Sequence, residues 1–346
     1  MSTASAGIDE SRVTDWLRAR VPALAEPLTF DLIAGGRSNL TYRVADAAGT
    51  RWVLRRPPLG HVLATAHDMA REHRIIAALA GSPVPVPSLV GMCDDDSVIG
   101  APFYVMDHCD GLVVRDEHVG AELDPEARRR VGFELVDVLA QIHGVDIDAV
   151  GLGDLARREG YVERQLSRWA SQWQATKDGD DPAMDLLHDR LAASVPTQGP
   201  ATIVHGDYRL DNCIVGADGT VRAVLDWELC TLGDRRADLG LMLVYWVGPD
   251  DAVDLGIPAA TRLPGFPTRD ELLARYVERT GVDVGEVGWF QAFGYWKLAV
   301  ILQGVLVRYR AGAMGDDGDD GSGFTVLVRR LADAGLAALD AQGTVV

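Results

Sequence analysis

The chain has 346 residues and a formal net charge of −18, with 51 acidic against 33 basic side chains. Apolar residues make up 47% of it, enough for a sizeable core, so a disordered chain is excluded. The acidic balance argues against nonspecific binding to nucleic acid or to an anionic membrane, because both need a basic face. It suits a cationic or metal-bound substrate, and it equally suits a surface that is acidic only for solubility.

The cysteines and the apolar stretches indicate neither export nor membrane insertion. The four cysteines show no Cys-x-x-Cys spacing and no accompanying His cluster, so a disulfide framework or zinc site is not expected. Residues 1–12 are polar and lack the apolar segment of a signal peptide. The longest apolar stretch, 239–247, is too short for a bilayer, which needs about 20 residues. We therefore expect a soluble cytoplasmic protein.

The expected elements divide the chain into a strand-rich part and a helical part. The first part has a helix at 11–25, strands at 41–44 and 51–56 within a strand-rich stretch 28–56, a helix at 66–80, and strands at 84–90 and 103–106. The second part has one β-hairpin at 212–227 and helices at 124–143, 160–176, 183–193, 235–246, 269–280, 286–311 and 323–341. An α+β fold of two lobes follows, residues 1–107 and residues 108–346.

The strongest chemical signal is a His-x-Asp-x-x-x-x-Asn kernel that runs from His205 to Asn212. It precedes the predicted hairpin, whose second strand ends in Asp226. A hairpin of this length brings its outer ends together, so we expect Asn212 beside Asp226, as hard oxygen ligands suited to Mg²⁺. Asp207, on the loop beside that metal, could accept the proton of a hydroxyl. Phosphoryl transfer requires this combination of metal, positioning and a base-like carboxylate.

These residues carry a family resemblance. The kernel 205–212 together with Asp226-Trp227-Glu228 resembles the catalytic loop and metal-binding Asp of the aminoglycoside phosphotransferase and choline kinase-like families, which are relatives of protein kinases. The resemblance implies a two-lobed, protein-kinase-like fold that uses ATP and Mg²⁺ to phosphorylate a hydroxyl of a small molecule. It implies Asp207 as the catalytic base, with Asn212 and Asp226 as metal ligands.

Two further residues of the kernel acquire roles from this resemblance. His205 would brace the loop by hydrogen bonds. Arg209 lies two residues after Asp207, where protein kinases often have Lys. It would either contact the γ-phosphate or form a structural salt bridge.

The stretch 226–234, with Asp238 and Leu239, resembles most the kinase-like proteins related to the domain fused to acyl-CoA dehydrogenases in some eukaryotes. Asp234 and Asp238 are expected to be structural, because an Asp at a helix start can cap its free N–H groups. His143, at the end of a predicted helix, matches a position common in these families and is also interpreted as structural.

The residues that would bind the nucleotide are predicted in the first lobe. In the stretch 33–42, Gly35, Gly36 and Ser38 would let main-chain N–H groups cradle a phosphate, with a plain turn as the alternative. Part of this stretch, 35–42, resembles the same family. Segment 102–107 resembles the strand that leads into the hinge between kinase lobes, so adenine would bond to main-chain groups near Met106 and His108.

A kinase normally has a strand Lys paired with a helix Glu, and this chain departs from that pattern. Its only two lysines are Lys177 and Lys297, both outside residues 1–107. Arg55 occupies the matching strand position, with Arg56 as the alternative. The partner should be Glu72, which shares a helix face with apolar residues, where a lone carboxylate is costly and an Arg offers bidentate pairing.

The acceptor is not defined by these motifs. The dehydrogenase-linked resemblance implies a hydroxyl on an acyl group, for example a hydroxyacyl-CoA, and the broader family implies an aminoglycoside or another amino-alcohol. The arginines at 157, 158, 164 and 168 would either meet an anionic CoA ester or be solvated helix residues. A function of another class, a non-catalytic nucleotide-binding pseudokinase, is supported only by the missing strand Lys.

Overall fold

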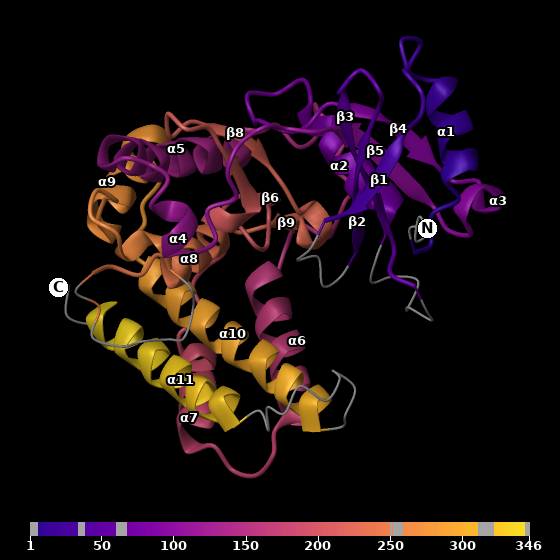
Figure 1. Ribbon diagram of the computed structural model, residues 1–346. Helices are drawn as coiled ribbons and strands as arrows, with labels where there is room; N and C mark the ends of the chain where they lie inside the picture. The colour runs from indigo at the N-terminus through magenta and orange to yellow at the C-terminus, as the bar shows by residue number, and fades with distance from the viewer. Residues whose placement is uncertain are drawn as a thin grey trace. The chain divides into compact units, whose positions relative to one another are not determined.

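The computed structural model describes residues 6–33, 39–59, 68–249, 251, 259–310 and 322–342 (Figure 1). The chain divides into two compact units. Unit 1 comprises Met1–Gly111 with Arg222–Glu228, and unit 2 comprises Leu112–Val221 with Leu229–Val346. The segment that carries Asp226 therefore belongs to the first unit, although the chain reaches it through the second.

Unit 1 is built on a five-stranded antiparallel sheet in the order β1-β2-β3-β5-β4. Its strands are β1 (Thr29–Leu32), β2 (Leu40–Ala45), β3 (Arg51–Arg56), β4 (Leu89–Cys93) and β5 (Phe103–Asp107), and its helices are α1 (Glu10–Arg18), α2 (Met69–Leu79) and α3 (Asp96–Ile99). One core of this unit joins α1 to the sheet, with the Trp16 and Phe103 rings 5.0 Å apart in an edge-on contact. Burial of these apolar side chains stabilises the packing of the helix on the sheet.

Three predicted elements of unit 1 are wrong in extent. The helix predicted at 66–80 begins only at Met69, where Asp68 caps it, and prolines explain the other two. The strand predicted at 84–90 begins only at Leu89, because Pro85 and Pro87 cannot donate to a sheet ladder. The helix predicted at 11–25 ends at Arg18, since Pro22 has no N–H to donate to the Arg18 carbonyl.

Unit 2 is mainly helical. Its helices are α4 (Glu117–Gly120), α5 (Pro125–Gly144), α6 (Tyr161–Thr176), α7 (Pro182–Ala193), α8 (Arg236–Tyr245), α9 (Arg269–Thr280), α10 (Val287–Arg310) and α11 (Ser322–Gln342), with short 3₁₀ turns η1 (Leu210–Asn212), η2 (Trp227–Leu229, which runs over from unit 1) and η3 (Ala260–Arg262). The seven helices predicted in this half are confirmed to within one residue at each end. The predicted hairpin is also present, as β7 (Cys213–Val215) and β8 (Val221–Val224, which from Arg222 on belongs to unit 1). Strand β6 (Thr202–Val204) pairs with β9 (Thr231–Gly233). The α+β class is thus confirmed.

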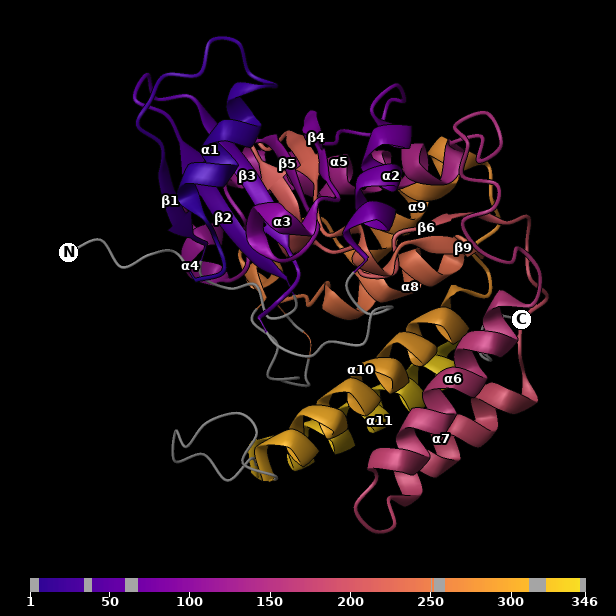
Figure 2. The same cartoon turned by 90° about the vertical axis from the view of Figure 1, so that its right-hand side faces the viewer.

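Helix α10 is the centre of unit 2. It packs against α6, α7, α8 and α11, as Figure 2 shows, and its tryptophans Trp289 and Trp296 are fully enclosed. Within the described part of the chain, α10 is the one helix long and apolar enough to cross a membrane by length and composition, and 67% of its most apolar window is buried in the structure. Enclosure by four other helices accounts for that apolar character.

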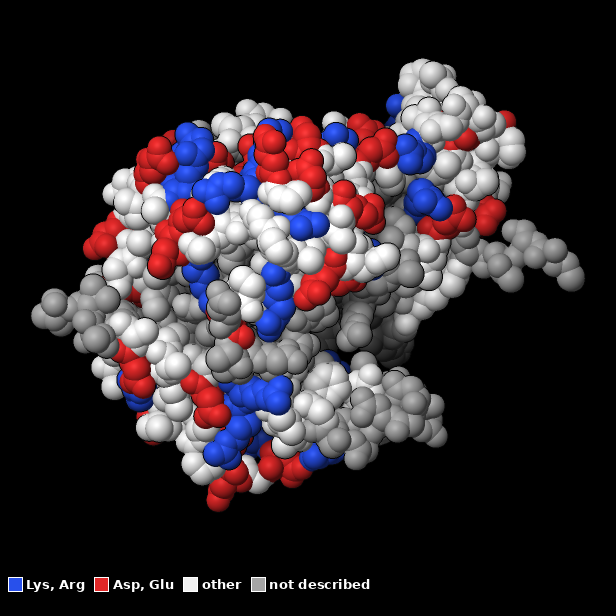
Figure 3. All heavy atoms as spheres, turned by 60° about the vertical axis from the view of Figure 1, so that its left-hand side comes forward, with Lys and Arg blue, Asp and Glu red and all other residues white. Residues whose placement is uncertain are grey.

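Charge is not sorted by sign on the face of the molecule drawn in Figure 3. Acidic and basic side chains are interspersed on it. The acidic excess of the sequence therefore does not collect into one field on this face.

We predict that Gly240→Ala destabilises unit 2. A Cβ at Gly240 in α8 would lie 2.5 Å from the carbonyl carbon of Phe290 and 2.7 Å from the amide nitrogen of Gln291, both in the main chain of α10. Overpacking against main chain costs about 1–3 kcal/mol of unfolding free energy. Urea unfolding measures it, with Gly144→Ala as the control, because nothing lies within 4 Å of a Cβ there. Equal stabilities for the two variants would contradict the close approach of α8 and α10.

Candidate active site

One buried carboxylate fixes the main chain of the loop between β6 and η1. Asp238, in the first turn of α8, accepts hydrogen bonds from the main-chain N–H groups of His205 (2.6 Å) and Gly206 (2.8 Å). Burial would raise the pKa of Asp238, but hydrogen bonds and charge from His143, His205 and Gly206 lower it overall below its ordinary 3.8. Asp238 is structural, as predicted, and its role is to fix the loop rather than to cap a helix.

The same carboxylate connects the loop to two helices. His143, in the last turn of α5, places Nε2 3.4 Å from Asp238, and its Nδ1 lies 2.7 Å from the hydroxyl of Tyr276 in α9. Burial lowers the pKa of His143. His143 is therefore structural: through Asp238 it links α5 and α9 to the loop.

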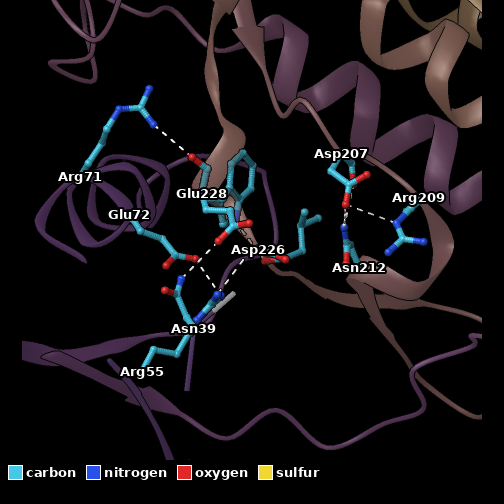
Figure 4. A network of polar contacts seen from close by, with 11 residues as sticks. Asn39, Arg55, Arg71, Glu72, Asp207, Arg209, Asn212, Asp226 and Glu228 are labelled. Carbon is cyan, nitrogen blue, oxygen red and sulfur yellow. Dashed lines mark hydrogen bonds and ion pairs between the residues drawn. The ribbon is translucent and has the colours of Figure 1, made fainter. Parts of the chain in front are cut away.

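Asp207 and Asn212 lie together on this loop (Figure 4). The side-chain amide of Asn212 donates to the main-chain oxygen of Asp207 (2.8 Å) and to its Oδ2 (2.9 Å). The amide N–H of Asp207 donates to Nδ1 of His205 at 3.3 Å, so His205 braces the loop. Because Nδ2 of Asn212 is turned toward Asp207, its Oδ1 is left to serve as a ligand. The Asp207 side chain is 27% exposed.

Arg209 is engaged within the same loop. Its Nε lies 3.3 Å from Oδ2 of Asp207, its Nη1 lies 2.8 Å from Oδ2 of Asp211, and its guanidinium stands 4.8 Å from the ring centroid of Tyr245. Burial raises the pKa of Asp211, and the charge of Arg209 opposes that shift. Of the two sequence alternatives for Arg209, the arrangement seen is the salt bridge.

In unit 1 the structure brings Arg55 and Glu72 together. Nη1 of Arg55, on β3, lies 2.7 Å from Oε1 of Glu72, on α2, and the Glu72 side chain is only 1% exposed. Burial raises the pKa of Glu72, and the charge of Arg55 opposes that shift. Arg56 points to the other side of the sheet, where it donates to the carbonyls of Pro57, Gly7 and Ile99. The register is therefore Arg55 opposite Glu72.

Asp226 occupies strained main chain beside this pair. Its φ is 62°, and among the described residues it is the one non-glycine with positive φ. Left-handed backbone costs an L-residue roughly 1–2 kcal/mol, Asp and Asn adopt it more readily than other non-glycine residues, and it clusters at functional sites. The carboxylate keeps 33% of its surface exposed and lies 3.4 Å from Nη2 of Arg55. The buried indole of Trp227, whose Nε1 donates to the Val224 carbonyl, anchors the turn.

Sequence reasoning missed a second contact set around Glu228. The side-chain amide of Asn39 donates to Oε2 of Glu228 at 3.2 Å, and Arg71 on α2 donates to the Glu228 carbonyl at 3.4 Å (Figure 4). Glu228 and Asn39 both stood inside the stretches that carry the family resemblance, which was the available signal. Arg71 had none.

The remaining predicted nucleotide contacts are only partly visible. Gly35, Gly36 and Ser38 lie outside the described residues. Met106 lies within the sheet, opposite Val53 of β3 and Leu89 of β4. The His108 amide donates to the Arg51 carbonyl at 3.2 Å, so that N–H is engaged.

Asn212 and Asp226 each carry a hard oxygen donor of the kind that magnesium prefers. Within the described ranges, no group of three or more His, Cys, Asp or Glu side chains is arranged to hold a metal. Asn212 in unit 2 and Asp226 in unit 1 offer one amide and one carboxylate oxygen. Mg²⁺ in nucleotide sites uses one or two protein oxygens and takes its other ligands from phosphate and water.

Comparison with known proteins identifies the class. The model of the phosphotransferase enzyme family matches residues 29–278. Mouse acyl-CoA dehydrogenase family member 10 is 38% identical over 292 residues, 83% of this chain and 27% of that protein. A crystal structure from Ralstonia eutropha JMP134, whose proposed identity is an aminoglycoside phosphotransferase, aligns with TM-score 0.80 and 31% identity over 96% of this chain and 98% of its own.

The chain therefore belongs to the phosphotransferase enzyme family, and its fold is that of the aminoglycoside phosphotransferases. The streptomycin–ATP complex of aminoglycoside phosphotransferase APH(2″)-IIa shares this fold, with TM-score 0.59 and 14% identity over 96% of this chain and 99% of that one. The chain spans only 27% and 40% of the curated relatives from mouse and human that it matches. It resembles their kinase-like part, and the two-lobed kinase-like fold predicted from the sequence is confirmed.

We predict that Arg55 and Glu72 are energetically coupled. In a double-mutant cycle of Arg55→Met and Glu72→Gln, the unfolding free energies should be non-additive by at least about 0.5 kcal/mol, since contacting residues couple by about 0.5–3 kcal/mol. The matched control is Arg56→Met with Glu72→Gln, which should add within about 0.5 kcal/mol because, among the described residues, the hydrogen bonds of Arg56 go to main-chain carbonyls and not to Glu72. Full additivity in the Arg55 cycle would show that the pair is not formed.

We predict that Asp238→Asn weakens folding in a pH-dependent way. Asn cannot accept both amide bonds as a carboxylate does, so the loss at pH 7 should be about 1–3 kcal/mol. The folded pKa of Asp238 is lowered, so its contribution is full above the unfolded value of 3.8 and disappears as pH falls through the folded pKa. The gap between parent and variant should therefore close below pH 3.8. Urea unfolding from pH 7 to pH 3 measures it, with exposed Asp189→Asn as control, and a constant gap would contradict the assignment.

Proposed function

We propose that the chain transfers the γ-phosphate of ATP, with Mg²⁺, to a hydroxyl of a small molecule. One observation carries this: an accessible Asp207 carboxylate is held by Asn212, whose own oxygen is left for a cation. Family membership supports the phosphotransferase class. The ATP complex of a protein with the same fold supports the choice of nucleotide.

Each residue has a role in the proposed transfer. Asp207 accepts the hydroxyl proton as the acceptor oxygen forms its bond to the γ-phosphorus, while the bond from phosphorus to the β,γ-bridging oxygen breaks and ADP leaves. Asn212 and Asp226 would hold the magnesium ion, which supplies neutralisation of phosphate charge when bound. Arg55, fixed by Glu72, would contact the nucleotide phosphates. His205 and Arg209 act through Asp207 and position it.

For the acceptor we favour a hydroxyl on an acyl group, such as a hydroxyacyl-CoA. The relatives named acyl-CoA dehydrogenase family members support this choice. An aminoglycoside or other amino-alcohol is the alternative, supported by the Ralstonia protein. All four cysteines are free thiols, which supports a reducing compartment, so we place the protein in the cytoplasm as part of the proposal.

A non-catalytic pseudokinase is the competing function of another class. Its support was the absent strand Lys, and the Arg55–Glu72 pair weakens it. Turnover of ATP with candidate acceptors separates the two functions, because a pseudokinase binds nucleotide without transferring phosphate.

We predict that Asp207→Asn lowers turnover by roughly 10²–10⁴-fold, the usual contribution of a positioned general base. Asn keeps the size and one oxygen but cannot take the proton, so ATP affinity should stay within a few-fold of the parent. Turnover is measured by phosphate transfer to hydroxyacyl-CoAs and aminoglycosides with mass detection, and affinity by calorimetry. Asp218→Asn, in the turn of the hairpin, is the control and should change neither.

Two outcomes would contradict this assignment. Near-parent turnover in Asp207→Asn would remove Asp207 as the base. Equal ATP affinity with and without Mg²⁺ in the parent would remove Asn212 and Asp226 as ligands of a shared metal.

A further inference from the structure

Lys297 is an ammonium group inside the most apolar helix of the chain. It lies in α10 between Trp296, which is fully buried, and Leu298, which is 9% exposed, and it is itself half-buried. It is one of only two lysines in the sequence. Enclosing a charge in apolar surroundings is costly unless it is compensated, so this Lys requires an explanation that the proposed transfer has not supplied.

The contacts of Lys297 point to the catalytic loop. Its Nζ donates to the carbonyl of Gly206 at 3.0 Å, the residue directly before Asp207. Gly206 has φ +85°, and a Cβ there would lie 2.7 Å from the Leu229 carbonyl, so the peptide that Lys297 contacts is fixed in orientation. One carbonyl satisfies one of the three N–H donors of an ammonium.

No carboxylate of the described residues lies within ion-pair distance of Lys297. The two carboxylates close enough to influence it, Asp207 and Asp238, are already used by other donors. Burial lowers the pKa of Lys297, and these two charges oppose the shift. The ammonium is thus attracted toward the loop without being neutralised there.

A second cation, the exposed Arg168, lies near the same Trp169 ring as Lys297. The Lys297 ammonium lies 5.6 Å from the ring centroid of Trp169, in α6, and the guanidinium of Arg168 lies 5.7 Å from the same centroid. Arg168 is exposed and forms no ion pair with any described residue, whereas its neighbours on the same segment are engaged: Arg158 with Asp148, and Arg164 with main-chain carbonyls. The buried Nε1 of Trp169 also lacks an acceptor in the described part. Apart from the Gly206 carbonyl that Lys297 contacts, these donors have no acceptor among the residues that the structure describes.

We propose that Lys297 and Arg168 bind an anionic group of the acceptor, beside Trp169, while the acceptor hydroxyl meets Asp207. This rests on the proposed phosphotransfer and narrows its substrate class to hydroxyl compounds that carry a carboxylate or phosphate. A polycationic acceptor such as an aminoglycoside would be repelled by both side chains. The anionic group can be the carboxylate of a free hydroxy acid or the phosphates of a CoA ester, and the two sources are separated by the test.

The test compares acceptors that differ in charge. They are 3-hydroxybutyrate, 3-hydroxybutyryl-CoA, the neutral 3-hydroxybutyramide and streptomycin, assayed for KM and kcat by phosphate transfer and for binding by calorimetry. The variant is Lys297→Met, which suits an apolar helix and should keep or raise the melting temperature. Lys177→Met at the end of α6 is the matched control, and the exposed Arg168→Gln is a second variant.

We expect the parent to prefer an anionic acceptor over the amide, and Lys297→Met to raise KM for that acceptor by about 10–100-fold, the value of a charge-assisted hydrogen bond. KM for the amide should not change, and Lys177→Met should resemble the parent. Arg168→Gln should raise the same KM by several-fold. A preference for 3-hydroxybutyrate assigns the carboxylate as the bound group, and a preference for the CoA ester assigns the phosphates.

Other outcomes overturn the proposal. A preference for streptomycin would do so, as would a Lys297→Met variant that loses stability and kcat equally for every acceptor, the signature of a purely structural Lys. Turnover that is independent of Lys297 would reject this inference and leave the proposed phosphotransfer standing. Binding of anionic probes that depends on Lys297, without any turnover, would support the anion site and reject the proposed phosphotransfer.

Discussion

The carboxylate of Asp238 is the constraint on which the loop that carries Asp207 depends. It is fully buried and accepts the amides of His205 and Gly206, so removing it would orphan two N–H groups in the interior, each at a cost of about 1–3 kcal/mol. Through His143 it is also joined to Tyr276, and so to helices α5 and α9. The helical core therefore sets the position of Asp207 through the main chain, without any contact to its carboxyl group.

The acidic side chains with structural roles and those with proposed chemical roles differ in their solvent exposure. Glu72 and Asp238, which hold structure, have side chains only 1% exposed. Glu72 pairs with Arg55 through Oε1, and Asp238 accepts two main-chain amides. Asp207 and Asp226, to which we assign chemistry, keep 27% and 33% of their side-chain surfaces exposed. A base or a metal ligand must remain reachable, so its position has to be fixed by main-chain geometry and by neighbours, as the strained turn at Asp226 and the Asn212 amide do.

The sequence predicts what is local and leaves open what is distant. The helices of unit 2 were predictable because amphipathic periodicity and acidic or hydroxyl caps, such as Asp124, Asp181 and Thr268, mark their starts. The contact of Asp238 with the loop joins residues 33 positions apart, and that of Asn39 with Glu228 joins residues 189 apart, so no local pattern encodes them. Arg55 and Arg56 were indistinguishable for a related reason: β3 is buried on both faces along most of its length, so alternation gave no preferred side.

The geometry around Arg55 explains why an Arg suits this strand position. Arg55 contacts Glu72 through Nη1 and Asp226 through Nη2, two carboxylates at once from two nitrogens held in one plane. A Lys would have to share a single ammonium between them, with a more flexible stem. Lys297 faces the opposite requirement, one carbonyl and space beside it, for which a compact point charge is suited. The use of each cation matches its geometry, so the absence of the strand Lys is no evidence of lost catalysis.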